Sequence, residues 1–316
     1  MRHSKNSKTN FLFNLVLISK MSVSADYIDY KYRHFFIQWL INIDLPLFRR
    51  LAHNMPNWLI PKPTKSVHLR LPNELLIYID PVKDKGVENT LYFTGTYEMG
   101  TLDVIDRFLP EEGTFIDVGA NIGLMSLYAA LKTGDDGRVI AFEPNIETYK
   151  IAEHNISINS FEDKIQLIKK GLGSKSETKK LYDNWSINRG AASLVKNSDE
   201  AQGSEIEITK LDKIIDGRLV DLVKIDVEGY ELEVLKGATS LLKRDHPPVL
   251  IVECTEETEH QDYSRSDLYN FIQDTQPRYK FYKLKGTKLR RSPLIKIDSV
   301  DDLPTHDNLI CIPSAI

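Results

Sequence analysis

Cysteine is scarce in this sequence, with only Cys254 and Cys311 among 316 residues. Two isolated cysteines make no disulfide framework, and both lie in apolar segments, so we expect buried free thiols. The eight histidines never pair at the spacing of metal ligands. A Gly-x-Ser-x-Gly elbow, a Walker loop and a Cys/His nucleophile arrangement are also missing. The sequence therefore offers no support for a cysteine-based metal site, a serine or cysteine hydrolase, or a P-loop enzyme.

The sequence also has no large excess of charge of either sign. Lys and Arg number 41 while Asp and Glu number 45, which gives a formal net charge of −4. Since the basic residues are scattered rather than striped, a nucleic-acid partner is disfavoured. Apolar residues make up 41% and charged residues 27% of the chain. This composition is ordinary for a globular protein that is large enough to bury a substantial core.

No apolar run near the N-terminus is long enough to span a membrane, since Phe11–Ile18 falls far short of about 20 residues. Basic residues precede this run and Val23–Ala25 resembles a signal-peptidase site, but Lys20 separates the two features. We therefore predict that residues 1–25 form a flexible or amphipathic extension. A cytoplasmic location is the prediction, and secretion is the alternative.

Residues 26–90 are predicted to form an appendage or lid over the main domain. Their first part carries aromatic and aliphatic side chains at mixed helical spacing, and Pro46 and Pro56 would break it into short helices. Two alternating segments, Val67–Leu71 and Leu75–Ile79, are separated by three turn-forming residues. That arrangement is typical of a small β-hairpin.

From Thr114 onward, short apolar runs alternate with helical stretches, which indicates βαβ units and a parallel sheet covered on both faces. The predicted strands are Phe115–Val118, Val139–Glu143, Ile165–Lys169, Leu222–Asp226 and Val249–Glu253, with Tyr279–Lys283 and Leu309–Ile312 closing the sheet. The predicted helices are Ile122–Lys132, Glu147–Asn159, Glu231–Lys243 and Ser266–Asp274. Residues 171–210 are predicted to form an insertion with some extended structure, including Glu205–Thr209.

A strand, a glycine-rich turn and a helix follow one another in residues 115–123, Phe-Ile-Asp-Val-Gly-Ala-Asn-Ile-Gly. Gly119 lets the backbone turn tightly beside a ligand, and Gly123 permits close packing of helix and strand. A dinucleotide pyrophosphate favours Gly-x-Gly-x-x-Gly, but Asn121 stands where the second glycine belongs. The carboxylate of Asp117 instead favours a cationic ligand, such as the amino group and sulfonium of S-adenosylmethionine. An ordinary strand–turn–helix junction is the alternative.

Glu143 ends the next predicted strand and is followed by Pro144. It lies about 20 residues beyond the glycine turn, where an acid accepts hydrogen bonds from ribose hydroxyls in doubly wound nucleotide sites. A solvated glutamate that caps the next helix is the alternative. NAD binding would use the same acid, so Glu143 predicts only that the ligand contains adenosine. The form of the glycine turn is what distinguishes S-adenosylmethionine from NAD.

Three ionisable residues, Lys224, Asp226 and Glu228, alternate along a central strand and the turn after it. Alternation places them toward one side at the carboxyl end of the strand, where ligands bind in such sheets. Group transfer to an alcohol hydroxyl needs proton removal or metal polarisation, because this hydroxyl has a high pKa. Asp226 and Glu228 are the candidate bases or ligands of a divalent cation, with Glu253 on the adjacent strand end as a further carboxylate. The alternative for Lys224, Asp226 and Glu228 is a Lys–carboxylate network that only orders the turn after the strand. The alternative for Glu253 is a structural hydrogen bond.

Several motifs occur in an order that resembles the FkbM-type methyltransferases over about residues 92–313. The motifs are Gly95-Thr-Tyr-Glu98, Ile116-Asp-Val-Gly-Ala-Asn-Ile-Gly123, Ala141-Phe-Glu-Pro144, Asn188-Arg-Gly-Ala-Ala-Ser193, Leu211-Asp212, Lys224-Ile-Asp-Val-Glu-Gly229 and Asn308-Leu-Ile. The resemblance implies an α/β class I methyltransferase (Rossmann-like) fold in residues 91–316, a doubly wound seven-stranded sheet whose last strand is antiparallel. It also implies S-adenosyl-L-methionine as the cofactor and O-methylation of a sugar or secondary-metabolite hydroxyl.

Site residues follow from the same resemblance. Donor contacts are implied for Glu98, Asp117, Gly119, Asn121, Gly123, Glu143 and Asp226. Asp226 and Glu228 are implied as the acceptor-side acids, with Lys224 beside them. The predicted function is an S-adenosylmethionine-dependent O-methyltransferase with a small-molecule or carbohydrate acceptor. Two alternatives are an NAD(P)-dependent oxidoreductase, disfavoured by the missing second glycine, and a non-catalytic methyltransferase-like partner subunit, disfavoured by intact acids at two strand ends.

Overall fold

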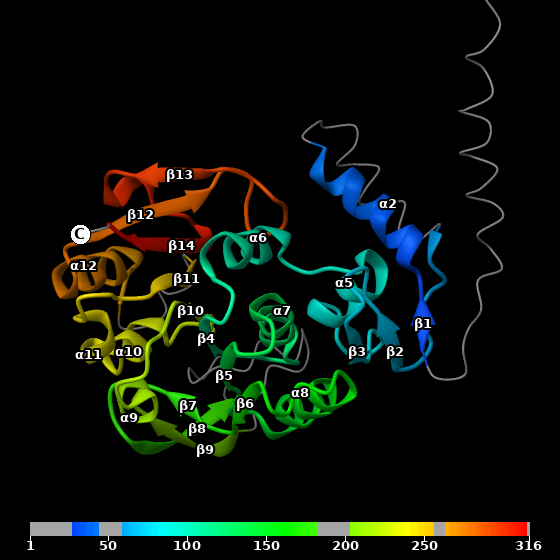
Figure 1. Cartoon of the computed structure of the whole chain (residues 1–316), viewed down its shortest axis with the longest axis horizontal. Coiled ribbons are helices and arrows are strands. Elements are labelled where there is room, and N and C mark those ends of the chain that lie inside the picture. The colour runs from blue at the N-terminus through cyan, green and yellow to red at the C-terminus, as the bar shows by residue number, and fades with distance from the viewer. Residues whose placement is uncertain (1–26, 44–58, 183–202, 256–262, 315–316) are drawn as a thin grey trace, which may run out of the picture.

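The residues that the computed structural model describes are 27–43, 59–182, 203–255 and 263–314. Predictions that concern residues 1–25, the breaks at Pro46 and Pro56, and the Asn188–Ser193 motif lie outside the described residues. Figure 1 shows the described elements, which pass from a small N-terminal group of helices and strands into a large sheet flanked by helices.

A sheet of eight strands forms the centre of the molecule, in the order β13-β12-β14-β11-β10-β4-β5-β6. Its strands are β4 (Thr114–Val118), β5 (Arg138–Phe142), β6 (Ile165–Ile168), β10 (Leu222–Ile225), β11 (Val249–Thr255), β12 (Tyr279–Leu284), β13 (Leu294–Ile297) and β14 (His306–Pro313). The first five pair in parallel. These are the five apolar runs, so the predicted parallel strands are confirmed, with small differences at their ends. Chain order reverses between β4 and β10, because β5 and β6 extend on one side and β11 on the other.

The last strand, β14, is antiparallel to both of its neighbours, β11 and β12. The predicted fold class is therefore confirmed, but the sheet has one strand more than the seven predicted. This additional strand, β13, pairs antiparallel with β12 at the edge of the sheet. Two of its four residues, Leu-Ile-Lys-Ile, are exposed and one is buried, and so short a run has no periodicity that separates a strand from a loop.

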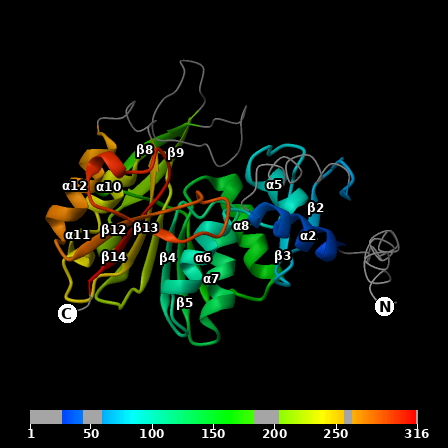
Figure 2. The same cartoon turned by 90° about the horizontal axis from the view of Figure 1, so that it is seen from above.

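Helices cover both faces of the sheet and give three layers, as Figure 2 shows. One face carries α6 (Met99–Phe108), α7 (Leu124–Thr133) and α8 (Ile146–Ile158), and the other carries α9 (Leu211–Ile215), α10 (Glu231–Lys236), α11 (Thr239–Leu242) and α12 (Arg265–Thr275). The single helix predicted over Glu231–Lys243 is two helices, because Gly237 ends α10. Within the described ranges no helix combines the length and apolar content that crossing a bilayer demands.

Two hydrophobic clusters fill the spaces between the layers. Neighbouring strand residues alternate between them, so that Phe115 packs toward α7 and α8 while Ile116 packs toward the opposite helices. Cys254 and Cys311 belong to the second cluster, where both are buried and free. The predicted buried free thiols are therefore confirmed.

Residues 171–209 supply a second, smaller sheet in the order β7-β9-β8. Its strands are β7 (Gly171–Leu172), β8 (Glu177–Tyr182) and β9 (Gly203–Thr209). The extended structure predicted at Glu205–Thr209 is part of β9 and is confirmed. A cavity, called the principal cavity below, lies at the carboxyl ends of the central strands. Leu172, Leu181 and Ile206 line it, so this small sheet forms one of its walls.

The N-terminal residues that the structure describes, 27–43 and 59–98, contain helices and a three-stranded sheet. The elements of this N-terminal part are β1 (Ile28–Asp29), α2 (Lys31–Asn42), β2 (Val67–Arg70), β3 (Leu76–Ile79) and α5 (Val87–Thr94). β2 and β3 form the predicted hairpin, which is confirmed. Side chains of the hairpin, including Leu69, Ile77 and Ile79, join the hydrophobic cluster of α7 and α8. The N-terminal part is therefore continuous with the core on that face of the large sheet.

Asn155 on α8 connects three segments of the chain. Its side chain is completely buried, and its Oδ1 accepts a hydrogen bond from the Tyr78 N–H at 2.6 Å. Its Nδ2 donates to the carbonyls of Ile122 at 2.9 Å and Tyr78 at 3.3 Å. One amide side chain thus joins the hairpin, the end of the glycine turn and α8.

Replacing Asn155 by Ala should lower the free energy of unfolding by about 2–3 kcal/mol, because it leaves buried N–H and carbonyl groups without partners. Urea unfolding of the variant and the wild type measures this loss. Lys150→Ala, an exposed change on the same helix, is the control and should leave the unfolding midpoint unchanged. Equal midpoints for Asn155→Ala and the control would contradict the connecting role.

Candidate active site

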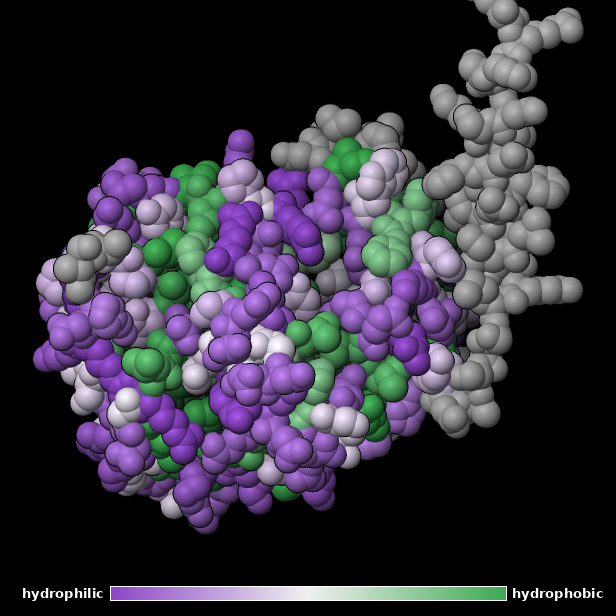
Figure 3. Space-filling model, in the orientation of Figure 1, coloured by the Kyte–Doolittle hydropathy of each residue, from purple (hydrophilic) through white to green (hydrophobic). Residues whose placement is uncertain are grey.

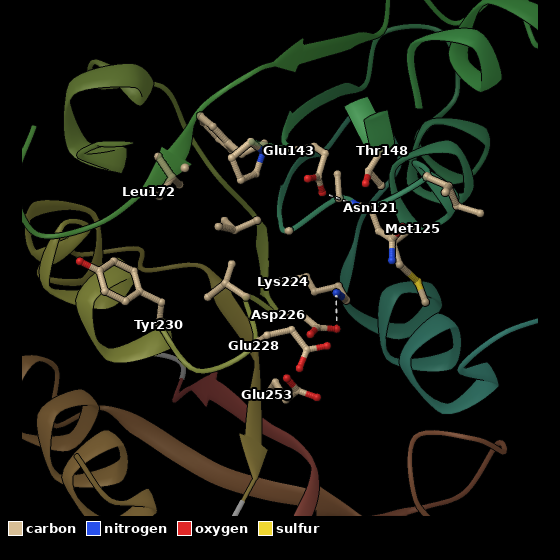
Figure 4. Close-up of a pocket in the computed structure, with 18 of the residues that line it drawn as sticks. Asn121, Met125, Glu143, Thr148, Leu172, Lys224, Asp226, Glu228, Tyr230 and Glu253 are labelled. Atoms are coloured by element: carbon tan, nitrogen blue, oxygen red, sulfur yellow. Dashed lines mark hydrogen bonds and ion pairs between the residues drawn. The ribbon is translucent and has the colours of Figure 1, made fainter. Parts of the chain in front are cut away.

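The principal cavity opens at the carboxyl ends of the central strands and has a volume of about 220 Å³. It lies where chain order reverses between β4 and β10, which is where ligands bind in doubly wound sheets. The turns after β4, β5 and β10, together with Glu253 near the end of β11, form its floor, and Figure 4 shows the side chains that they contribute. The small sheet, the start of α6 and the loop between β12 and β13 form its walls.

The glycine turn after β4 lies against the turn after β10. Gly119 has a φ of +81°, and a Cβ there would lie 1.9 Å from the carbonyl oxygen of Asp226, so the position requires glycine. Asn121 has a φ of +51°, a left-handed conformation that asparagine adopts more readily than most residues. Gly123, with a φ of +88°, begins α7 and faces Ala152 of α8. The close packing predicted between helix and strand is therefore a contact between two helices.

Asp117 lies beneath the cavity rather than in its wall. Its side chain is completely buried, and its Oδ2 accepts a hydrogen bond from the Ser126 hydroxyl at 2.6 Å. Its Oδ1 has no hydrogen-bond partner among the described residues. Burial raises the pKa of Asp117, while Lys224, its register partner on β10, opposes this shift. A carboxyl group thus lies directly under the cavity floor.

Glu143 follows β5 and lines the cavity. Its Oε2 accepts a hydrogen bond from the Asn121 N–H, and its Oε1 accepts one from the Asn145 N–H, both at 2.9 Å. The carboxyl group is therefore held in one orientation beside the glycine turn. Burial raises the pKa of Glu143 to about 7, although the two backbone N–H groups act against this shift.

Lys224, which is buried, and Asp226, which is partly exposed to the cavity, form an ion pair on the cavity floor, with 2.9 Å between Nζ and Oδ2. Burial alone would lower the pKa of Lys224, but Asp226 and Asp117 raise it. Burial alone would raise the pKa of Asp226, but Lys224 and Lys288 lower it. Both partners are therefore charged at neutral pH.

Glu228 lies in the turn that follows β10. Because β10 ends at Ile225, strand alternation does not extend to Glu228, which has a left-handed φ of +51°. The turn nevertheless places Glu228 in the cavity wall together with Lys224 and Asp226. Figure 4 shows these side chains converging on the same space.

Glu231, at the start of α10, holds this turn in place. Its side chain is almost completely buried, and its Oε1 accepts hydrogen bonds from the N–H groups of Val227 at 3.1 Å and Gly229 at 3.0 Å. Its Oε2 accepts a hydrogen bond from the Tyr263 hydroxyl at 2.6 Å. Sequence reasoning placed Glu231 only as the first residue of a helix. An acid in the first helical turn was the available signal, but its burial depends on the fold.

Lys288, from the loop between β12 and β13, reaches back into the cavity. Its Nζ lies 2.9 Å from Oε1 of Glu98 and 2.9 Å from Oε1 of Glu253. Burial alone would lower the pKa of Lys288, but Asp226, Glu98 and Glu253 raise it. No sequence pattern indicated Lys288, because its partners lie on distant segments of the chain.

Glu98 and Glu253 are also connected through β14. Glu98 accepts a hydrogen bond from the Thr101 hydroxyl at 2.9 Å, and Asn308 donates to that hydroxyl at 2.8 Å. Asn308 is in turn the register partner of Glu253. Burial, followed by the charge of Asp226, raises the pKa of Glu253 well above its usual range. The Asn308-Leu-Ile motif thus has a role in orienting the cavity acids.

A divalent cation on these acids is not supported. The described residues contain no group of three or more His, Cys, Asp or Glu side chains arranged to hold a metal ion. Asp226, Glu228 and Glu253 do lie together, as Figure 4 shows. However, Lys224 pairs with Asp226 and Lys288 pairs with Glu253, so the protein places its own cations among these carboxylates.

Acidic side chains outnumber basic ones around the cavity. The acids in its wall are Glu98, Glu143, Asp226, Glu228 and Glu253, and the cations are Lys170, Lys224 and Lys288. Asp117 adds a further carboxyl group beneath the floor. An excess of carboxyl groups in a concave site favours a cationic ligand.

Fold and site together define a doubly wound α/β protein with an acid-rich ligand cavity at the reversal of strand order. The family model of the Methyltransferase FkbM domain matches residues 117–281, which is more than half of the chain. The chain therefore belongs to the FkbM methyltransferase family. This membership confirms the resemblance that the ordered motifs predicted.

Several curated proteins are similar to this chain. Methyltransferase sdnD from Sordaria araneosa is 30% identical over 41% of this chain and 61% of its own length. Hexuronic acid methyltransferase AglP from Haloferax volcanii is 30% identical over 46% of this chain and 59% of its own length. Methyltransferase 1 from Beauveria bassiana is 23% identical over 54% of this chain and 74% of its own length. The matched region thus spans less than two thirds of the length of the first two.

Similar chains also occur among solved structures. The Methyltransferase FkbM from Methylobacillus flagellatus KT has a TM-score of 0.40 and 16% identity, covering 70% of this chain and 52% of that one. The O-methyltransferase from Bacillus cereus in complex with SAH has a TM-score of 0.37 and 13% identity, covering 66% and 76%. At this degree of likeness these structures carry no further information on the site.

Replacing Lys288 by Met should lower the free energy of unfolding by about 3–5 kcal/mol at neutral pH, because it leaves buried carboxyl groups without their cation. The loss should be larger at pH 8 than at pH 5. In the variant, the folded-state pKa of Glu253 rises further above its unfolded value. The stability that this group contributes is therefore present at low pH and is lost as the pH rises through the folded pKa.

Urea unfolding at the two pH values measures this difference. Lys280→Met, an exposed change on β12, is the matched control and should shift neither midpoint. A loss of equal size at pH 5 and pH 8 would show that Lys288 stabilises by packing and not by its charge.

Proposed function

We propose that this protein is an S-adenosylmethionine-dependent O-methyltransferase that acts on a hydroxyl group of a sugar or other small molecule. The observation that carries this proposal is the acid-rich cavity around the glycine turn, with Glu143 after β5 and Asp226 after β10. Membership of the FkbM methyltransferase family supports methyl transfer as the reaction.

The cavity residues fit S-adenosylmethionine, whose sulfonium and amino groups are both cationic. Carboxyl groups predominate in the cavity wall, and Asp117 beneath it keeps one buried oxygen without a partner among the described residues. Glu143 is oriented by the N–H groups of Asn121 and Asn145 and retains lone pairs that can accept hydrogen bonds from ribose hydroxyls. Both ends of the donor therefore have partners of suitable chemistry.

The oxidoreductase alternative fits this site less well. A dinucleotide pyrophosphate binds to free N–H groups at a helix N-terminus. Here the Asn121 N–H is already bound to Glu143, and the surrounding side chains are mainly acidic. A negatively charged pyrophosphate would be repelled by these carboxyl groups. The partner-subunit alternative is disfavoured because the ion pair of Lys224 and Asp226 is intact in the cavity.

S-adenosylmethionine, when bound, supplies a methyl group that is activated by its positively charged sulfur. Lys224 fixes the orientation of Asp226, which we assign to accept a hydrogen bond from the acceptor hydroxyl. The proton of this hydroxyl passes to the carboxylate of Asp226 or to that of the neighbouring Glu228. As it leaves, the acceptor oxygen bonds to the methyl carbon, and the electron pair of the broken carbon–sulfur bond stays on sulfur. Positioning within the cavity supplies much of the acceleration.

A carbohydrate or small-molecule acceptor agrees with the sequence, whose basic residues are scattered and form no stripe for nucleic acid. One similar protein is named a hexuronic acid methyltransferase, and a sugar acceptor for the present chain is consistent with that name. A sugar hydroxyl needs a base for its reaction, and Asp226 and Glu228 are the candidates for this base.

Titration calorimetry tests this function directly. The wild-type protein should bind S-adenosylmethionine and S-adenosylhomocysteine and give no heat of binding with NAD or NADP. Absence of affinity for both methyl-donor ligands would overturn the proposal.

The affinity for S-adenosylhomocysteine should fall as the pH drops below about 7, the pKa of Glu143. Ribose hydroxyls donate to the ionised carboxylate, so below this pH the group must first lose its proton. The dissociation constant should therefore rise by about tenfold from pH 8 to pH 6. Glu143→Gln should bind more weakly at pH 8 and lose the pH dependence. An affinity of the wild type that stays constant between these pH values would contradict the ribose contact.

Asp226→Asn should lower the rate of methyl transfer by about 10²- to 10⁴-fold, because it removes a positioned acid from the acceptor side. Calorimetry should show that S-adenosylhomocysteine still binds. Transfer of labelled methyl to a panel of hydroxylated sugars measures the rate. Asp216→Asn, in the exposed loop before β10, is the control and should keep the wild-type rate. Full activity of Asp226→Asn would remove Asp226 from the mechanism.

A further inference from the structure

A second cavity, of about 690 Å³, adjoins the principal one. Tyr97 and Glu98 line both cavities, so the two spaces share a wall. The second cavity, called the outer groove below, lies between α2 and α5 of the N-terminal part and the loop between β12 and β13. Methyl-donor binding as proposed above leaves this groove without a use.

Two hydrogen bonds connect the loop between β12 and β13 to α2 and to α6. The Arg291 N–H donates to Oδ1 of Asn42 at the end of α2, at 3.3 Å. The Gly100 N–H at the start of α6 donates to the carbonyl of Lys288 at 2.8 Å. Figures 1 and 2 both show the loop extending over α6 toward the N-terminal elements. The segment that carries Lys288 into the principal cavity therefore also forms the far wall of the outer groove.

Hydroxyl groups line the inner part of the outer groove. Thr94 uses its hydroxyl to donate to the carbonyls of Thr90 at 2.8 Å and Thr96 at 2.7 Å. The hydroxyls of Thr96 and Tyr97 have no hydrogen-bond partner within the described ranges, and each can both donate and accept. Burial, with the charge of Glu98, raises the pKa of Tyr97, so its hydroxyl stays neutral. Groups of this kind recognise the hydroxyls of a polyol.

The mouth of the outer groove is basic. Lys285 is exposed, and its ammonium group makes no ion pair or hydrogen bond to the described part of the chain. Arg290 is a second cation of the lining, and its Nε donates to the carbonyl of Gly286 at 3.0 Å, which shapes the loop. Figure 3 shows hydrophilic side chains gathered over this loop.

The two adjoining cavities therefore differ in the kind of ionisable group that predominates in their walls. The principal cavity has an excess of carboxyl groups, whereas the mouth of the outer groove carries Lys285 and Arg290. Ligands of opposite charge are sorted by such a difference in potential. A cationic donor fits the first space, and an anionic molecule fits the mouth of the second.

We propose that the outer groove is the acceptor site, and that it takes a polyhydroxylated molecule bearing an anionic group, a carboxylate or a phosphate. The anionic group lies near Lys285, and the polyol hydroxyls contact Thr96 and Tyr97. Tyr97 and Glu98, which line both spaces, mark where the reacting hydroxyl enters the principal cavity. This assignment rests on the proposed methyltransferase function and adds the charge class of the acceptor to it.

Binding of sugar probes to the protein saturated with S-adenosylhomocysteine tests the assignment, with saturation-transfer NMR titration as the measurement. The probes are methyl β-D-glucuronide, glucose 6-phosphate and the neutral methyl β-D-glucoside. At least one anionic probe should bind more tightly than the neutral one, and raising the salt concentration should weaken it. Comparison of the two anionic probes distinguishes a carboxylate from a phosphate acceptor.

Two substitutions in the outer groove have a matched control. Lys285→Ala should weaken the preferred anionic probe by about three- to fivefold, as expected for one partly solvated charge pair. Thr96→Val should weaken all probes that bind, because it removes a hydroxyl at nearly constant size. Lys280→Ala removes an exposed lysine from β12 outside the outer groove and should change nothing. All three variants should keep the wild-type affinity for S-adenosylhomocysteine.

The outcomes separate this inference from the proposed function. Failure of the wild type to bind S-adenosylhomocysteine would overturn the methyltransferase proposal itself. Normal binding of that ligand, together with a neutral probe that binds as well as the anionic ones, would overturn only the anionic acceptor. Equal effects of Lys285→Ala and Lys280→Ala, or no binding of any probe, would overturn the assignment of the outer groove.

Discussion

Burial of carboxyl groups at one end of the large sheet is the constraint on which the rest of this structure depends. Asp117, Glu143 and Glu231 are buried there, and Glu253 on β11 is partly buried beside them. Buried carboxyl groups are costly unless cations or N–H groups compensate them. The chain meets this requirement with backbone N–H groups from the turns and with two lysines, Lys224 and Lys288.

This compensation explains the arrangement of distant segments. Lys224 lies between Asp117 and Asp226 because β4 and β10 pair in register. Lys288 enters from the loop between β12 and β13. The pairing of β13 with β12 helps to place this loop. Acids that are held but incompletely neutralised form a preorganised environment for a positively charged ligand. The stability of this end of the sheet is therefore linked to what the cavity can bind.

The N-terminal part extends the same site. Its hairpin is connected to α8 through Asn155, while α2 and α5 border the outer groove beside Lys285. Elements outside the matched family region thus contribute the surface next to the principal cavity. In the proposed function, residues 117–281 bind the methyl donor. The elements around the outer groove then select which acceptor molecule binds. The change from acidic to basic surroundings occurs across Tyr97 and Glu98.

Local sequence pattern alone predicted the parallel strands, the hairpin, the glycine turn and the acids at strand ends. These features depend on periodicity and turn residues, which involve only residues that are close in the sequence. Three features could not be predicted from the sequence. The sequence around Lys288 and around Glu231 has no distinctive pattern, and β13 is too short to show a periodicity. Their roles arise from contacts between segments far apart in the chain.

By itself, the sequence determined the fold class, the family and which acids reach the carboxyl ends of the strands. Only the tertiary structure decided how these acids are paired, since pairing requires cations from distant loops to come within about 3 Å. It also decided that Asp117 lies beneath the cavity, that Gly123 meets a helix, and that lysines stand among the carboxyl groups. The physical reason is that hydrophobic pattern is local, whereas electrostatic compensation depends on position in space.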